Sequence, residues 1–123
     1  MTSEYYFADT YALVELVKGN PNFKRFLECN LVTTLWNLTE LYYNLLKEGN
    51  REIAYSFFLL YYKRQTMITP LSIFFGSAFK LKHKKEYLSY VDCIGYARAK
   101  ELGIKFLTGD SKFKDKDNVE FVR

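Results

Sequence analysis

Five short β-prone runs alternate with helical segments along this chain, and that alternation restricts the fold more than any other feature. The runs cover 4–8, 31–34, 66–70, 104–108 and 119–122. Helical spacing of apolar residues fills the gaps between the first four runs, at 9–19, 20–29, 35–49, 50–64, 72–86 and 89–103. Strands joined by helical crossovers form parallel sheets covered on both faces. The sequence therefore predicts an α/β protein with three α/β/α layers and a mainly parallel sheet of four to five strands, in a single domain over residues 1–123.

Several helix boundaries can be placed from local signals. The segment 35–49 has apolar residues at i, i+3, i+4, i+7 and i+8, namely Leu38, Leu41, Tyr42, Leu45 and Leu46. Pro21 is expected in the first turn of the helix over 20–29, and Ser72 and Ser89 are expected to cap the next two helices after 66–70. The run 57–62 is apolar on nearly every side of its helix, which indicates a surface for a second copy or another protein.

Charge and cysteine usage limit the class of protein. Residues 1–62 carry 5 Lys/Arg and 7 Asp/Glu, whereas residues 63–123 carry 13 Lys/Arg and 7 Asp/Glu. The basic half is compatible with a polyanionic partner and equally with an ordinary solvated surface. Cys29 and Cys93 form no CxxC pair, and neither a signal peptide nor an apolar span of ~20 residues is visible. We expect reduced, buried thiols and a cytoplasmic protein.

Acidic residues stand at the predicted strand ends. Asp9 follows the run 4–8, and Asp110 follows the run 104–108. Asp92 lies in the first turn of the helix before that last run, and Glu40 lies in the first half of the helix after 31–34. Because parallel strands end at the same edge of a sheet, we expect these four carboxylates to converge there.

Four carboxylates in one cleft repel one another and ionise together only beside a cation. Their hard oxygen atoms suit Mg²⁺ or Mn²⁺, and such an ion can activate a water against a phosphodiester. The one histidine, His83, lies in a basic segment and is expected to be exposed to solvent, so a Ser-His-Asp or Cys-His mechanism is not favoured.

Each acid also has an ordinary structural explanation. Asp9 is a good helix N-cap residue, and Asp92 lies three residues after Ser89 in the pattern of a capping box. Glu40 falls opposite the leucine stripe of its helix, where a solvated glutamate also falls, and Asp110 suits a turn. For a single acid the two explanations are about equal. For all four together, coincidence on one edge of one sheet is the weaker explanation.

The chain resembles the PIN-domain ribonucleases, and among them the small VapC-type toxins of toxin–antitoxin pairs. The stretches that carry the resemblance are "YYFADTYALVEL", "LTELYYNLLKEG" and "LSYVDCIGYARAKELGIKFLTGDSKFK", which span nearly the whole chain. The last is the most specific, because it holds an Asp, a helix with small residues, a Gly, a strand, Thr-x-Asp and Phe in that order. The resemblance implies a PIN-like fold and a Mg²⁺- or Mn²⁺-dependent endoribonuclease that forms a homodimer and is inhibited by an antitoxin protein.

Carried over by position, the resemblance assigns the metal site to Asp9, Glu40, Asp92 and Asp110, with Thr10 and Thr108 as polar positions beside them. One departure is that Ser111-Lys112-Phe113 follows Asp110, where relatives frequently have a further acid. Asp115 and Asp117 come later and are expected in a solvated loop. The basic residues expected to hold RNA are Lys112, Lys114 and, less directly, Arg98. Each of the three can equally be an ordinary solvated charge.

Two other functions remain open from the sequence. A PIN-like module can bind RNA or protein without cutting it, in which case binding survives loss of the acids. A phosphatase or flap-type nuclease acting on DNA is the third possibility, and a panel of RNA, single-stranded DNA and branched DNA separates it from the others.

Overall fold

The computed structural model describes residues 4–123 and contains a four-stranded sheet in the order β2-β1-β3-β4, with every neighbouring pair parallel. The register places Phe7 opposite both Val32 and Phe106. This sheet confirms the predicted parallel α/β architecture. The strands are β1 (Tyr5–Ala8), β2 (Asn30–Val32), β3 (Lys105–Thr108) and β4 (Val119–Phe121).

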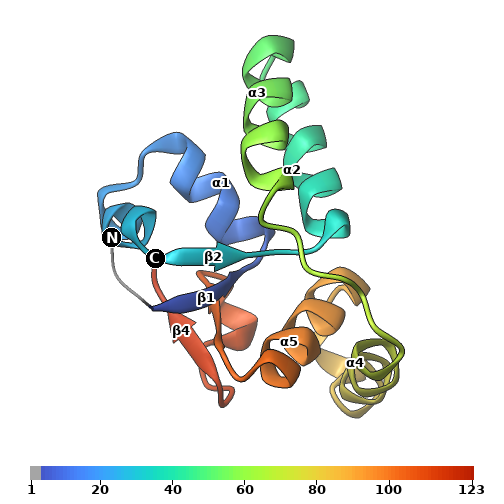
Figure 1. Ribbon diagram of the computed structural model, residues 1–123. Helices are drawn as coiled ribbons and strands as arrows, with labels where there is room; N and C mark the ends of the chain where they lie inside the picture. Colours follow the sequence, from blue (N-terminus) through green and yellow to red (C-terminus); the bar gives the residue numbers. More distant parts are fainter. Residues whose placement is uncertain (1–3) are drawn as a thin grey trace.

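Helices cover both faces of the sheet, as Figure 1 shows. Helix α1 lies over one face and α5 over the other, with α4 packed on the outer side of α5. The α2–α3 hairpin projects beyond the sheet. The helical elements are α1 (Thr10–Lys18), η1 (Pro21–Glu28), α2 (Leu35–Lys47), α3 (Arg51–Tyr62), α4 (Pro70–Lys82), η2 (Lys84–Glu86), α5 (Tyr90–Leu102) and η3 (Ser111–Phe113).

The central strands are buried on both faces, because their side chains alternate between two hydrophobic cores. In β1, Tyr6 and Ala8 belong to the core beneath α1, η1 and α2, whereas Phe7 belongs to the core beneath α5. In β3, Leu107 and Phe106 divide in the same way. These hydrophobic strands hold the carboxyl ends of β1 and β3 side by side, where the site lies.

The run 66–70, the third of the five predicted strands, is not a strand, so this prediction was wrong. Only an isolated parallel bridge joins Thr33 to Gln65, with the Thr66 N–H donating to the Thr33 carbonyl at 2.7 Å. The residues that follow are used to start α4. Thr69 is its N-cap and forms a capping box with Ser72, so Ser72 closes the cap instead of being the cap residue.

The remaining structural expectations from the sequence can be compared with the observed elements one by one. The segment 20–29 forms a 3₁₀ helix that begins at Pro21, and Ser89 caps α5 as predicted. Cys29 and Cys93 are both buried, and no disulfide joins them. Helix α3 packs on α2 but leaves much of its apolar surface exposed, at Ile53, Tyr55, Leu59, Leu60 and Tyr62. Within residues 4–123, every helix is too short or too polar to cross a bilayer.

Candidate metal-dependent nuclease site

Asp9 occupies the junction between β1 and α1. Its N–H donates to the Leu107 carbonyl at 3.2 Å, which keeps it beside β3. Its Oδ1 accepts the N–H of Ala12 at 2.8 Å, so the side chain caps α1. The residue is only 1% exposed. Asp9 is therefore both a helix cap, as one sequence explanation held, and a carboxylate at the carboxyl edge of the sheet.

Asp110 follows the carboxyl end of β3, the strand next to β1. Thr108 links the two acids: its Oγ1 accepts the Asp110 N–H at 3.0 Å, and its side chain hydrogen-bonds the Asp9 carboxylate. Thr108 is fully buried. The position predicted to be polar beside the acids therefore lies between them.

Gly109 brings Asp110 round the end of the strand through a very close approach. A Cβ at this position would lie 2.1 Å from Cε1 of Tyr11 and 2.5 Å from the carbonyl oxygen of Val122. Because both contacts are far below van der Waals distance, only glycine fits. The turn that directs Asp110 thus depends on the packing of α1 and of the segment after β4.

Asp92 and Glu40 come from the two faces of the sheet. Asp92 lies in the first turn of α5, where its N–H donates to Ser89 Oγ at 3.0 Å. Glu40 lies in α2, and its Oε1 accepts the Thr10 hydroxyl at 2.6 Å. The first residue of α1 thus holds a carboxylate of α2, and Thr10 lies beside an acid as the sequence predicted.

Asp9, Asp92 and Asp110 repel one another, and Glu40 repels Asp92. Burial raises the pKa of Asp9 well above its usual range, and the carboxylates of Asp92 and Asp110 raise it further, against the hydrogen bonds from Thr108 and Ala12. Burial likewise raises the pKa of Asp92 to about 6, with Glu40 and Asp110 adding to the rise and Lys112 opposing it. A cluster of this kind favours protons, or a cation, over free carboxylates.

The oxygen donors of this acidic cluster (Asp9, Glu40, Asp92 and Asp110) have the chemistry that Mg²⁺ and Mn²⁺ bind. Within the described chain, however, no three His, Cys, Asp or Glu side chains are arranged to hold a metal ion as they stand. The structure therefore brings the four predicted acids into mutual repulsion without closing them into a ready-made set of ligands. The donor set fits a divalent cation in chemistry.

Asn37 is a polar residue of this region that the sequence reasoning missed. It is fully buried, its Nδ2 donates to Thr10 Oγ1 at 3.2 Å, and its Oδ1 accepts the Thr34 hydroxyl at 2.6 Å. Asn37 therefore donates a hydrogen bond to the Thr10 hydroxyl, which itself donates to Glu40. The available signal was an asparagine one turn before Glu40, next to the leucine stripe that packs into the core.

The three predicted basic contacts differ in their surroundings. Lys112 is exposed, its N–H donates to Asp110 Oδ1 at 3.0 Å, and its charge acts on Asp92. Lys114 is exposed, with its ammonium 5.8 Å from the centre of the Phe121 ring. Arg98 is instead held by Glu101, with Nη1 2.8 Å from Oε1, and its side chain is 14% exposed. Lys112 is thus the basic residue nearest to the acids by its contacts.

Three further residues weighed in the sequence lie apart from the acidic cluster. His83 is only partly exposed: its Nδ1 lies 2.6 Å from Glu86 Oε2 and its side chain is 23% exposed, so full solvent exposure was wrong. Asp117 accepts the Tyr96 hydroxyl at 2.7 Å and pairs with Lys100. Asp115 is exposed, as expected for a loop.

Comparison with protein-family models matches residues 6–119 to the PIN domain. Curated protein sequences give no match. The stretches matched by the family model include all four acids of the cluster. The fold and the site described above are therefore those of a chain that resembles this family over nearly all of its length.

Solved structures share the fold at low sequence identity. VapC20 from Mycobacterium tuberculosis, described as a sarcin-ricin loop cleaving toxin, matches with a TM-score of 0.81 at 18% identity, covering 96% of this chain and 99% of that one. VapBC2 from Rickettsia felis, bound to a promoter DNA fragment, gives 0.73 at 18%, covering 97% and 99%. VapBC-1 from nontypeable Haemophilus influenzae gives 0.73 at 17%, covering 95% and 96%.

Proposed function

This chain belongs to the PIN domain family, and from that premise we propose that it is an endoribonuclease, dependent on Mg²⁺ or Mn²⁺, and the toxin of a type II toxin–antitoxin pair. The observation that carries the proposal is the mutual repulsion of Asp9, Asp92 and Asp110, with Glu40 beside them. The relative VapC20 is described as a toxin that cleaves the sarcin-ricin loop, which supports the same class of activity here.

In the proposed site, Asp9, Asp92 and Asp110 would hold the ion and Glu40 would complete or modulate its surroundings. A divalent cation there supplies activation of water and neutralisation of charge on the phosphate. Thr108 would orient the carboxylates of Asp9 and Asp110, because it hydrogen-bonds both residues. These residues together define where hydrolysis of the phosphodiester would take place.

Glu40 is proposed to keep a fixed orientation through its neighbours. The Thr10 hydroxyl donates to it, and Asn37 in turn donates to Thr10. Because Asn37 is fully buried, its end of this chain of hydrogen bonds is shielded from competing water. Asn37 would act as a positioning residue, without contact to substrate.

The proposed RNA contact at the site is Lys112. Its ammonium is exposed beside the acids, and among residues 4–123 it forms no ion pair with an acidic side chain. It would bind a phosphate oxygen and offset the negative potential of the carboxylates. Lys114 would extend this contact along the backbone of the RNA, while Arg98 is a weaker candidate because Glu101 already holds it.

An antitoxin and a second copy are the proposed protein partners. A groove of about 500 Å³ opens between α1 and α2 and includes Thr10, Lys18 and Lys47, so a segment bound there would contact the residue that donates to Glu40. A separate apolar hollow of about 380 Å³ includes Trp36 and Ile73 and supports a homodimer. A toxin–antitoxin complex from Klebsiella pneumoniae shares this fold, with a TM-score of 0.75 at 18% identity, which supports an antitoxin partner.

The test is cleavage of a panel of RNA, single-stranded DNA and branched DNA with Mg²⁺ or Mn²⁺. Cleavage of RNA that stops in EDTA and in Asp9→Asn supports the proposal, and Asp115→Asn is the matched control because Asp115 is exposed in a loop. Full activity in EDTA or in Asp9→Asn would contradict it.

A non-catalytic binding module is the competing function. One observation favours it: in the described chain no three acids are placed to hold an ion as they stand. In that case RNA binds equally well to the wild type and to Asp9→Asn, and neither protein cuts any member of the panel.

A further inference from the structure

Tyr87 presents its ring to solvent at the tip of the connection between α4 and α5. The residue is 82% exposed, the highest value among the exposed large hydrophobic side chains of residues 4–123. Its backbone is left-handed, with φ of 56°. Glycine adopts this conformation without strain, whereas a tyrosine does not. Folding alone therefore gives no reason for a large aromatic side chain here.

The backbone around Tyr87 is held on several sides. Lys112 Nζ donates to the Tyr87 carbonyl at 3.2 Å, and Lys80 donates to the carbonyl of Leu88, which is buried. Directly before Tyr87, Glu86 accepts from Lys116 at 2.7 Å and binds His83. The ring thus projects from a turn whose backbone is held by hydrogen bonds. Less conformational entropy of this turn is lost when a ligand binds.

The same contacts connect the backbone of Tyr87 to the segments that carry two acids of the cluster. Lys112 donates from its side chain to the Tyr87 carbonyl and from its backbone N–H to the Asp110 carboxylate. Ser89, two residues after Tyr87, caps the helix that carries Asp92. The turn at Tyr87 is therefore linked to the segments of Asp110 and Asp92.

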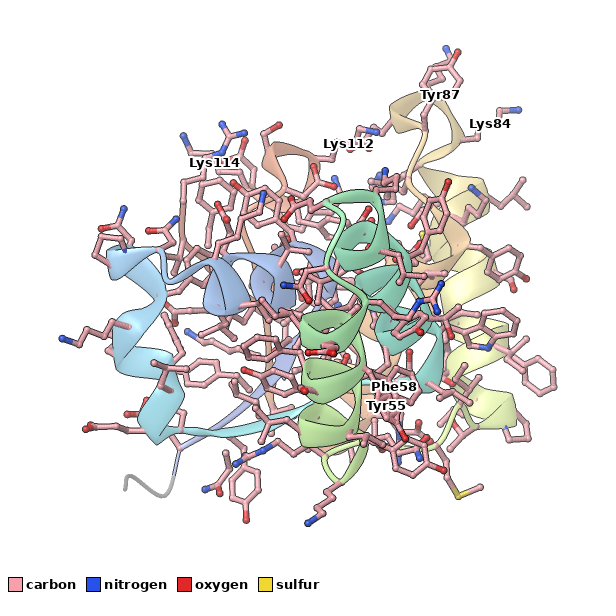
Figure 2. The ribbon with its side chains drawn as sticks, turned by 90° about the horizontal axis from the view of Figure 1, so that it is seen from above. Tyr55, Phe58, Lys84, Tyr87, Lys112 and Lys114 are labelled. Carbon is pink, nitrogen blue, oxygen red and sulfur yellow. The ribbon has the colours of Figure 1, made fainter. Side chains whose placement is uncertain are left out.

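Lysine side chains lie along the same edge of the molecule as the ring. In Figure 2, Lys84, Tyr87, Lys112 and Lys114 point outward from one edge of the molecule, while Tyr55 lies on the other side. Lys84, Lys112 and Lys114 make no ion pair with any acidic side chain in the described part of the chain. Cations that follow a backbone, together with an exposed aromatic face, form the pattern by which proteins bind single-stranded nucleic acid.

We propose that Tyr87 is a base-stacking residue, which holds one unpaired nucleobase of the RNA next to the phosphate at the acidic cluster. Lys84, Lys112 and Lys114 hold the phosphates on either side. The inference rests on the proposed ribonuclease function and adds to it the residue that selects unpaired over paired RNA. Paired bases are already stacked in a duplex and cannot reach the ring.

The test measures binding without cleavage. A labelled single-stranded RNA of about 12 nucleotides is titrated in EDTA and followed by fluorescence anisotropy. Tyr87→Gly accepts the left-handed backbone and removes only the ring, so its fold is expected to survive, as a thermal melt verifies. We expect its affinity to fall about 5- to 100-fold, and Tyr87→Phe and Tyr87→Trp to stay within about threefold of the wild type.

Tyr55→Ala is the matched control, because it removes an exposed tyrosine from α3, and it should bind like the wild type. The same strand annealed to its complement should bind more weakly to the wild type and show little effect of Tyr87→Gly. Stacking is overturned if Tyr87→Gly binds the single strand within about twofold of the wild type, or if Tyr87→Phe loses as much as Tyr87→Gly.

Failure of the inference and of the ribonuclease proposal look different. If the wild type cleaves RNA and Tyr87→Gly binds as well as the wild type, the stacking role alone is wrong. If the wild type neither binds nor cleaves RNA, the ribonuclease proposal is wrong and the stacking role is wrong with it.

Discussion

The Thr10 hydroxyl donates a hydrogen bond of 2.6 Å to Oε1 of Glu40. This bond joins the first turn of α1 to α2, two helices that follow different strands. Asp9 is adjacent to Thr10, so this bond, together with the packing of α1 on α2, sets the position of Glu40 relative to Asp9. The arrangement makes the acidic cluster sensitive to changes in α2 as well as to changes at strand ends.

We predict that Asp9→Asn folds normally and is inactive. Asparagine is as good an N-cap as aspartate, so the bond to the Ala12 N–H survives, while the carboxylate for the cation is lost. Cleavage should fall by more than about 100-fold, and the melting temperature should not fall. Circular dichroism and an RNA cleavage assay measure the two outcomes. A variant that unfolds would show instead that the charge of Asp9 is needed for the fold.

A second prediction concerns the pH dependence of stability in the absence of metal. The folded-state pKa of Asp92, about 6, lies above its unfolded value, so the folded state binds the proton more tightly. Wild-type stability should therefore fall as pH rises from about 4 to about 6. Asp92→Asn removes this loss and should be more stable than the wild type at pH 7 by up to about 3 kcal/mol, with the difference vanishing near pH 4.

Urea unfolding in EDTA across this pH range gives the comparison. Asp115→Asn, at an exposed position, serves as the control and should follow the wild type at every pH. If the difference in free energy of unfolding between the wild type and Asp92→Asn stays constant with pH, the prediction is wrong.

Metal binding should displace protons. The raised pKa values of Asp9 and Asp92 mean that part of the cluster is protonated near pH 6, and a cation must replace those protons. Calorimetric titration with Mn²⁺ in two buffers of different ionisation enthalpy should show more proton release at pH 6 than at pH 8, and tighter binding at pH 8. Proton-neutral binding at both pH values is the opposing result.

Lys112→Ala should weaken RNA binding in a salt-dependent way. Loss of one phosphate contact lowers the slope of log affinity against log salt by about 0.7 for a single strand. Lys105→Ala is the control, because Lys105 is exposed at the amino end of β3, away from Asp110. Binding isotherms at several salt concentrations give the slopes, and equal slopes for wild type and Lys112→Ala would remove Lys112 from the interface.

Gly109→Ala should destabilise the fold by about 1–3 kcal/mol, because the added methyl would overlap the Tyr11 ring and the Val122 carbonyl. Cleavage should fall as well, since relief of the overlap must move Asp110. Urea unfolding measures the loss of stability. Ser111→Ala is the control, because Ser111 lies two residues after Gly109 and is exposed. An unchanged midpoint would mean that the turn can shift freely.

The sequence predicted most of the fold because its strong signals are local. Alternating strands and helices, the leucine spacing of α2 and the cap at Ser89 all appear where expected. The run 66–70 failed because β propensity says nothing about whether a sheet edge is available. Its residues were needed to build the capping box of Thr69 and Ser72, and that competition is decided by tertiary structure.

The placement of Asp9 and Asp110 at neighbouring strand ends could also be predicted, because strand ends in a parallel sheet share one edge. What could not be predicted is how buried polar groups connect. Asn37 resembles an ordinary helix residue in the sequence. Its bond with Thr34 is local to the start of α2, but its bond to Thr10 depends on how α1 and α2 pack. Arg98 likewise donates from Nε to Thr66 Oγ1 at 3.0 Å, a contact between distant segments that the sequence does not reveal.

The pairing of β1 with β3 has a consequence for biosynthesis. Asp9 belongs to the first strand and Asp110 follows the third, so nearly the whole chain separates two acids that lie on neighbouring strands. A growing chain on the ribosome carries Asp9 long before Asp110 exists. By the proposed mechanism, a translation product that ends before Asp110 cannot cut RNA. A cell making this protein therefore contains an active nuclease only after β3 has been synthesised and has paired with β1.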